Sequence, residues 1–262
     1  MQQELRFPFD LTESFPHLRV APIAEAVINW VARAGNPVLP DKLQRELAAR
    51  LPDYSQCQPQ RELEIEAHLD ADGATQSHRD SWHGFRLTSS DKGYIAQFNR
   101  DGMIFSRLPT YESWAIFAAE ARRLWAIFVE LAAPSEVQRL GVRFINRIEL
   151  IETSDAARYL ARTHNCLEPL GLPKSGYFYH SMHEVPGQPF QINVIETIQP
   201  ASPPLRERFG LILDIDVFTT QAFQPADEIM DDYLARMRWL KNKVFFTLMS
   251  KSALKEFKKG KK

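Results

Sequence analysis

The sequence is poor in cysteine and in glycine, and each shortage removes a class of function. Cys57 and Cys166 are the only cysteines and do not form a C-x-x-C pair, so a disulfide framework is not expected and a reducing compartment fits. Only 11 glycines are present, and there is no P-loop, no Rossmann glycine fingerprint and no G-x-S-x-G elbow. No motif supports catalysis, so the sequence favours a protein that is not an enzyme.

Long apolar runs and a strong net charge are also missing. The longest apolar stretch, Leu124 to Ala133, contains Glu130 and is too short to span a bilayer. The N-terminus lacks the basic-then-apolar pattern of a signal peptide, so we expect a cytoplasmic protein with no membrane partner. The formal net charge is −1, which gives no general attraction to nucleic acid. The exception is local, because Lys251 to Lys262 contains six lysines and one glutamate; nucleic acid could bind this lysine-rich C-terminal tail.

The chain does contain a weak internal repeat. Ile127, Phe128 and Leu131 match Val244, Phe245 and Leu248 at one offset (244 − 127 = 117). The same offset carries Asn29 onto Asn146, and it carries Tyr94, Ala96 and Phe98 onto Leu211, Leu213 and Ile215. Self-similarity at a fixed spacing is the signature of an internal duplication. It predicts that Asn29 and Asn146 occupy equivalent strand positions.

The order of predicted elements agrees with a duplication. Each half contains a strand, a short helix, several antiparallel strands and a long helix, which is typical of an α+β protein. We expect two tandem pseudo-repeats, each an antiparallel sheet with a short and a long helix packed on one face. The two sheets either stay separate or join edge to edge, and joining would leave a concave polar face opposite the helices. The predicted divisions are an irregular segment 1–18, a first repeat 19–134, a second repeat 135–257 and a basic tail 258–262.

Two local features belong to this prediction. The polar stretch Asp70–Asp80 is expected to be a loop. The last long helix is expected to start near Pro225 or Asp227 and to continue past Leu248 towards Phe257, because its apolar stripe continues.

Five residues are candidates for a ligand or partner groove: Asn29, Arg143, Asn146, Arg147 and Glu196. Each asparagine shares its strand parity with apolar residues, and a buried amide must be hydrogen-bonded. Each asparagine therefore ties its strand to a neighbouring loop, or the two meet near a pseudo-twofold axis, or both point into the groove. Arg143 and Arg147 lie on the other face of their strand, where they bind a carboxylate or phosphate or pair with Glu196, Asp214 or Asp216 across the sheet.

Asp214 and Asp216 are the candidates for a metal site. Carboxylates at i and i+2 of a strand share a face and lie about 7 Å apart along it. Such pairs hold magnesium against phosphate oxygens in phosphoryl-transfer enzymes. The alternative to a metal site is an ordinary strand with one face in the core and one face exposed to solvent. No phosphate-binding loop precedes these residues, which favours this alternative.

Four short segments resemble one known family. Pro22–Val27, Leu140–Ile148, Leu213–Asp216 and Asn242–Phe246 recur in this order in a sporadically distributed, uncharacterised family of bacterial and archaeal proteins. The resemblance covers almost the whole chain. It implies no established activity, but the patchy distribution implies horizontal transfer and hence a role in phage defence or in a toxin–antitoxin-like system.

The sequence thus favours a non-catalytic binding or interaction protein that uses a groove or seam between two α+β halves. Its partner would be a protein or a small ligand, with no cofactor. The alternative is a metal-dependent phosphoryl- or nucleotidyl-transfer enzyme centred on Asp214 and Asp216, and only this alternative requires magnesium.

Overall fold

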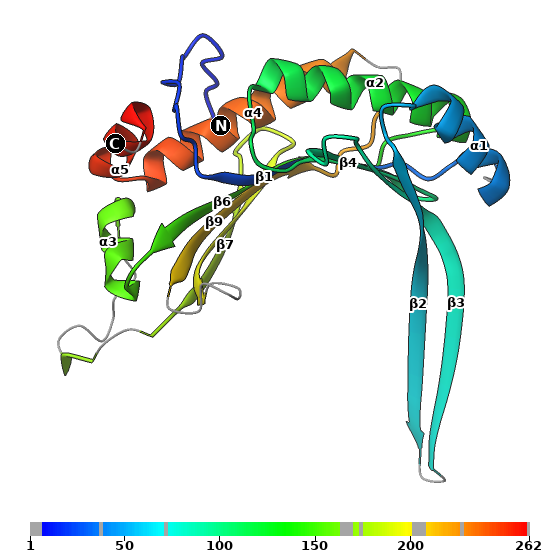
Figure 1. Ribbon diagram of the computed structural model, residues 1–262, viewed down its shortest axis with the longest axis horizontal. Helices are drawn as coiled ribbons and strands as arrows, with labels where there is room; N and C mark the ends of the chain where they lie inside the picture. The colour runs from blue at the N-terminus through cyan, green and yellow to red at the C-terminus, as the bar shows by residue number, and fades with distance from the viewer. Residues whose placement is uncertain are drawn as a thin grey trace, which may run out of the picture.

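The protein folds into a single curved antiparallel sheet with helices on one side (Figure 1). The computed structural model describes residues 7–36, 39–70, 73–162, 170–172, 175–200, 208–225 and 228–260. The predicted α+β class is confirmed, because the nine strands are all antiparallel and five α-helices accompany them. Figure 1 shows an arch, with α2 and α4 along its outer side and the sheet beneath them.

Nine strands form the sheet, in the spatial order β2-β3-β4-β5-β1-β6-β9-β8-β7. Their bounds are β1 Ile23–Val31, β2 Gln56–Asp70, β3 Gly73–Thr88, β4 Tyr94–Asn99, β5 Gly102–Arg107, β6 Arg139–Leu150, β7 Phe178–Glu184, β8 Gln191–Pro200 and β9 Phe209–Thr219.

The helices alternate with groups of strands along the chain. Their bounds are α1 Pro40–Arg50, α2 Trp114–Ala132, the 3₁₀ turn Thr153–Asp155, α3 Ala156–Tyr159, α4 Ile229–Leu248 and α5 Lys251–Lys259. Ser113 caps α2 by accepting a hydrogen bond from the Ile116 amide at 3.3 Å. Pro134 follows α2, which ends at Ala132.

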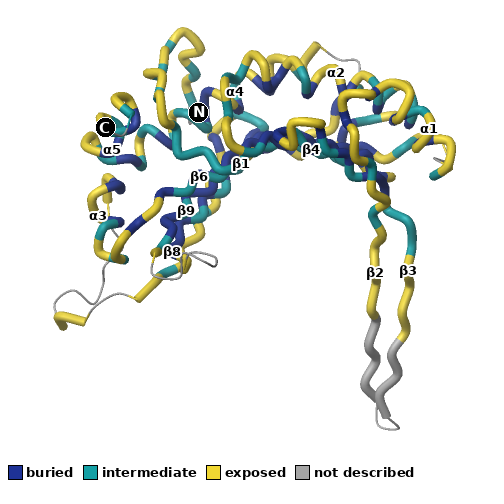
Figure 2. The backbone as a smooth tube through the Cα atoms, in the orientation of Figure 1, coloured by how far each residue is buried: buried dark blue, intermediate teal, exposed yellow. Residues whose placement is uncertain are grey.

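One apolar core fills the space between the helices and the sheet. In β1, Ala26, Ile28 and Trp30 are buried and face this layer, and the ring of Trp30 stacks on Trp125 of α2 at 5.1 Å. Figure 2 shows the buried residues concentrated in the central strands and on the inner sides of the helices. The large side chains that are almost fully buried are Trp30, Phe98, Phe105, Phe117, Phe144, Phe190, Ile28, Leu47, Leu51, Leu87, Met103 and Leu124.

β1 pairs with β6 near the middle of the sheet, a pair that we call the seam. Ile28 lies opposite Val142 and Val27 opposite Arg143, and the register shifts between Ile23 and Glu25. Of the two arrangements left open by the sequence, the structure contains the joined one. Pairing at the seam removes two exposed strand edges that would otherwise attract other chains.

Two local predictions are wrong. Gly73–Asp80 is not a loop but part of β3, which pairs with β2 from Gln56 opposite Thr88 to Asp70 opposite Gly73; residues 71 and 72 lie outside the described part. Figure 1 shows this hairpin extending from the sheet as a long arm. Its backbone hydrogen bonds are made between the two strands, so polar, exposed side chains are compatible with strand structure.

The last helix is also not continuous. α4 ends at Leu248, and Ser250 caps α5 by accepting from the Ala253 amide at 3.1 Å. The break is fixed by the Ser250 amide, which donates to the Tyr159 carbonyl at 2.8 Å. Lys258 and Lys259 of the predicted basic tail belong to α5, whose Phe257 is buried; residues 261–262 lie outside the described part.

Candidate functional site

The sheet has one face against the helices and one face away from them, which we call the open face. Side chains alternate between the two faces along each strand. In β1 the odd-numbered residues from Glu25 to Val31 point to the open face, and in β6 the odd-numbered residues from Arg139 to Glu149 do so. In β9 the register places Asp214 and Asp216 on this same face. The open face lies on the inner side of the arch (Figure 1).

Two arginine–aspartate pairs cross from β6 to β9 on the open face. Arg143 binds Asp214 in a bidentate manner, with Nη2 to Oδ2 at 2.5 Å and Nε to Oδ1 at 2.9 Å. Arg139 Nη2 donates to Asp216 Oδ2 at 2.9 Å. Neither arginine binds the residue directly opposite it. Arg143 lies opposite Asp216 but binds Asp214, and Asp216 is bound by Arg139 instead. The sequence predicted that Arg143 and Arg147 pair with acids across the sheet; this prediction is confirmed for Arg143.

Burial differs within these pairs. The Asp214 side chain is only 9% exposed, whereas that of Arg143 is 46% exposed and presents its outer edge to solvent. Burial raises the pKa of Asp216, while the neighbouring Arg139 and Arg143 act in the opposite direction. The hydrogen bond to Asp214 raises the pKa of Arg143, so this guanidinium stays charged. The pairs form a neutralised ionic ladder beside the seam.

Arg147 differs from the other two arginines of β6. It makes no hydrogen bond or ion pair through its side chain with any described residue. Its guanidinium lies over Gly210, where an added Cβ would come within 2.7 Å of Arg147 Cζ. Glycine at 210 therefore gives the guanidinium room to lie flat on β9. A planar cation with unused donors is suited to a carboxylate or to backbone carbonyls.

Several buried amide oxygens on the open face also lack described partners, among them those of Asn29 and Asn193. Asn29 Oδ1 on β1 and Asn193 Oδ1 on β8 are inaccessible to solvent, and no described group donates to either. Asn193 lies directly opposite Asp216, so one of these oxygens adjoins the ionic ladder. Buried acceptors in native structures are almost always satisfied, so each amide has an unused acceptor that a turn of its side chain would present to a donor from outside.

Aliphatic side chains form the floor between these polar groups. They come from five adjacent strands and are half-buried: Val27, Val31, Ile104, Ile145, Ile195 and Ile212. The open face therefore combines apolar area, charge pairs and amides, as protein interfaces do.

The sheet separates the five predicted groove residues into two groups. Asn29, Arg143 and Arg147 lie on the open face, but Asn146 and Glu196 lie on the core face and are 2% and 3% exposed. Neither buried residue can reach a ligand in the groove.

The two buried residues have structural partners instead. Asn146 Nδ2 donates to the Leu213 carbonyl at 3.0 Å, so its role is structural, but its partner is the neighbouring strand β9 rather than the expected loop or Asn29. Glu196 accepts a short hydrogen bond from the Tyr177 hydroxyl. Because Asn29 and Asn146 lie on opposite faces, the predicted equivalence of these two positions is wrong.

The offset of 117 also fails for the strands. It aligns β4 with β9. However, β9 is the neighbour of β6, and the neighbour of β1 on the corresponding side is β5, not β4. A shift of one residue moves every side chain to the other face. The odd offset therefore mismatches the faces of β1 and β6, whereas Ala96 of β4 and Leu213 of β9 do share the core face but occupy different places in the strand order.

Sequence reasoning missed Arg139 and Asn193. Arg139 is an odd-numbered residue of β6 like Arg143 and Arg147, so side-chain alternation along the strand would have placed it on the same face. It also lies over the ring of Phe218 at 4.6 Å, with Gly141 leaving the space. Asn193 had no such signal, because its place beside Asp216 depends on the register of β8 against β9.

The metal alternative meets a specific obstacle. Asp214 and Asp216 share a face as predicted, but each already accepts hydrogen bonds from an arginine. A magnesium ion would have to displace both guanidinium groups. Among the described residues, no group of three or more histidine, cysteine, aspartate or glutamate side chains is placed to hold a metal ion. In this structure the carboxylates of Asp214 and Asp216 are engaged by arginines rather than free to bind a metal ion.

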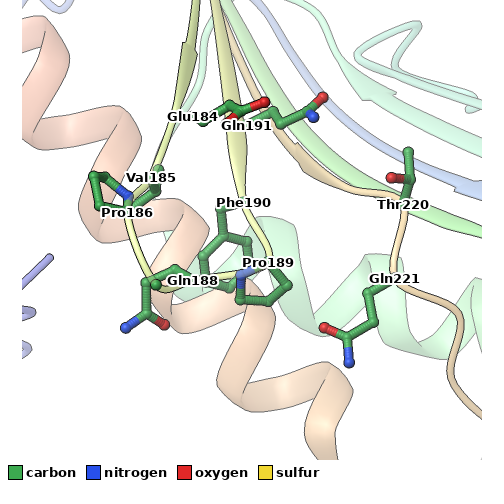
Figure 3. Close-up of a pocket in the computed structure, with 10 residues that line it drawn as sticks. Glu184, Val185, Pro186, Gln188, Pro189, Phe190, Gln191, Thr220 and Gln221 are labelled. Carbon is green, nitrogen blue, oxygen red and sulfur yellow. The ribbon is translucent and has the colours of Figure 1, made fainter. Parts of the chain in front are cut away.

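A separate hollow of about 440 Å³ lies at the turn between β7 and β8 (Figure 3). Figure 3 shows the turn residues on one side and Thr220 and Gln221 on the other. Its lining consists of Glu184–Gln191 with Thr220 and Gln221, so none of the predicted site residues contributes. Glu184 is its only charged group, which gives it no acid–base pair for catalysis.

Comparison with known proteins adds no assignment. The chain matches no protein-family model and no curated protein sequence. Within the described residues, no helix has the length and apolar character needed to cross a membrane.

Proposed function

We propose that this is a binding protein whose open face takes an extended segment of a polypeptide partner. The observation that carries the proposal is the pair of buried acceptors, Asn29 Oδ1 and Asn193 Oδ1, on a face turned away from the helices. A polypeptide backbone supplies N–H donors at regular intervals. Its carbonyl groups would be matched by the unused donors of Arg147.

The chemistry of the open face favours polypeptide over nucleic acid. A nucleic-acid surface needs an excess of positive charge, but Arg139 and Arg143 are each neutralised by an aspartate. Single-strand binding also uses stacked aromatic rings, and the Phe218 ring is occupied by Arg139. The aliphatic floor offers area that a peptide side chain can cover.

The proposed groove spans an internal duplication. In support, the order β1-β5-β4-β3 on one side of the seam corresponds to β6-β9-β8-β7 on the other. α1 and α2 would correspond to α3 and α4, and the alignment would use an even offset between β1 and β6 so that equal faces match. A segment bound along the seam would then contact both halves.

A display library of random 15-residue peptides tests the proposal directly. The chain is used as bait, and bound peptides are then measured against Val27→Lys, which places a charge in the middle of the open face. Ile116→Lys is the matched control, because Ile116 is an exposed aliphatic residue on α2. We expect peptides that bind the wild type and Ile116→Lys equally but lose at least tenfold in affinity for Val27→Lys. Failure to select any peptide, or equal binding by all three proteins, would contradict the proposal.

The metal-dependent transferase remains the alternative function, supported only by the shared face of Asp214 and Asp216. A magnesium or manganese titration of the wild type and of the Asp214→Asn/Asp216→Asn double variant decides it. A thermal shift with metal in the wild type alone would favour the enzyme.

The cellular role that the family resemblance implies is phage defence or a toxin–antitoxin-like function in the cytoplasm. Plaque counts on bacteria that express the chain or its Val27→Lys variant test this role. Binding of nucleic acid through α5 is a further alternative, and it requires steep salt dependence that falls when the lysines are replaced.

A further inference from the structure

β7 (Phe178–Glu184) is the last strand of the sheet, and its outer edge pairs with no described strand. Phe178 and Met182 are 68% and 67% exposed, although both are large and apolar. Proteins usually protect such an edge with lysine, proline or a bulge. β7 contains neither lysine nor proline, and its pairing with β8 has no register shift.

The hydrogen bonds to β8 show which backbone groups point outward. The Ile198 amide donates to the Tyr177 carbonyl at 3.3 Å, and the Val185 amide donates to the Phe190 carbonyl at 3.0 Å. Residues that bond to β8 therefore have odd numbers, because bonded positions alternate in an antiparallel pair. The N–H and C=O groups of Phe178, His180 and Met182 consequently point away from the sheet.

We propose that two copies of the chain pair through β7, antiparallel to one another, about a two-fold axis at His180. In this register Phe178 of each copy lies opposite Met182 of the second copy. The exposed apolar side chains thus cover one another on the same face. The outward backbone groups of Phe178, His180 and Met182 exchange about six hydrogen bonds across the axis.

The sequence of β7 favours this occupant over another strand. Phe178 and Met182 are placed symmetrically about His180, so a two-fold axis there is self-complementary. A register centred on Ser181 would instead place Phe178 opposite Glu184. Pairing with β2, the other end strand, would be head-to-tail and would produce open chains, whereas the two-fold pair closes as a dimer.

The expected dimer is weak, because a single strand pair buries much less than a standard interface. The side chains of Phe178, His180 and Met182 lie on the open face. Pairing would therefore join the open faces of two copies into one longer surface.

Sedimentation velocity of the full chain from 1 to 200 µM tests the dimer. We expect a monomer–dimer equilibrium in the micromolar range. His180→Pro removes the N–H at the axis without removing a bond to β8, since proline is tolerated on an outer edge. It should raise the dissociation constant at least tenfold, whereas His180→Ala should leave it within about threefold. Circular dichroism and thermal melts establish that each variant is folded.

Cysteine cross-linking tests the register independently, in a Cys57→Ser/Cys166→Ser background. In the dimer, the cysteines of His180→Cys in the two copies would face each other with Cα atoms about 5.5 Å apart, which is within the range for a disulfide. Glu184→Cys is the control, because its two copies would lie about 25 Å apart. We expect His180→Cys to form a disulfide at least tenfold faster. A wild-type monomer at 200 µM, open polymers, an unaffected His180→Pro dimer, or equal cross-linking rates would overturn the proposal.

Discussion

Replacing Lys241 by methionine should stabilise the protein at neutral and acidic pH but not at alkaline pH. Lys241 lies on α4, and its Nζ is 3.7 Å from the centre of the Phe144 ring on β6. Tyr111, which precedes α2, packs on the same ring at 5.3 Å. No described carboxylate pairs with Lys241. Burial, with a smaller contribution from the charge on Arg238, lowers the pKa of Lys241 to about 7.

The direction of the pH effect follows from proton counts. The unfolded chain holds the Lys241 proton up to about pH 10.5, whereas the folded chain releases it near pH 7. The unfolded state binds more protons between these values, so the free energy of unfolding rises with pH across this window. At about 1.4 kcal/mol per pKa unit, the cost of the charged amine below pH 7 is ~5 kcal/mol.

Urea unfolding at a series of pH values measures this cost. Lys241→Met keeps the methylene packing and removes the amine, so at pH 6 its free energy of unfolding should exceed the wild-type value by ~5 kcal/mol. By pH 10 the difference should fall within ~1 kcal/mol, since the wild-type amine is then neutral in the folded state. Lys243→Met on the same helix is the control, because Lys243 is exposed and paired with Glu13. A wild-type to Lys241→Met difference that stays constant from pH 6 to pH 10 would refute the reasoning.

Three further predictions concern stability and reactivity. Asn146→Ala removes a buried hydrogen bond to the Leu213 carbonyl and should cost ~1–2 kcal/mol in urea unfolding; no loss would show that the bond contributes nothing. Ser250→Ala removes the cap on the Ala253 amide and should cost ~1 kcal/mol, with Ser250→Thr as the control that retains the oxygen. Burial raises the pKa of the Cys57 thiol. In a Cys166→Ser chain, Cys57 should therefore react with iodoacetamide more slowly in the folded protein than in the urea-unfolded protein. Equal rates would contradict this.

Much of the element structure could be predicted from local sequence. The apolar stripe of α2, the turn at Asn99–Gly102 and the alternation of β9 are each encoded by residues close together in the chain. The failures were also local in origin. Asp70–Asp80 is polar on both faces, so a ribbon that extends from the sheet has the composition of a loop.

The candidate site could be predicted only in part, because β1 is apolar on both faces. Asn29 alternates with Val27 and Val31, but Ile28 and Trp30 on the other face are the residues that the helices cover. Periodicity groups residues that share a face, yet it does not say which face will be buried. That choice separated Asn29 from Asn146 and removed Glu196 from the groove.

By itself the sequence determined the α+β class, the approximate positions of most strands and helices, and the shared face of Arg143 with Arg147 and of Asp214 with Asp216. Only the tertiary structure decided that the halves share one sheet, that Arg143 and Arg139 bind the two aspartates, and that Asn193 lies beside Asp216. The physical reason is the range of the interactions. Backbone conformation and side-chain alternation are set by neighbours in the chain, whereas strand register and sheet order depend on residues farther apart, from 23 positions for Asn193 and Asp216 (216 − 193 = 23) to 71 for Arg143 and Asp214.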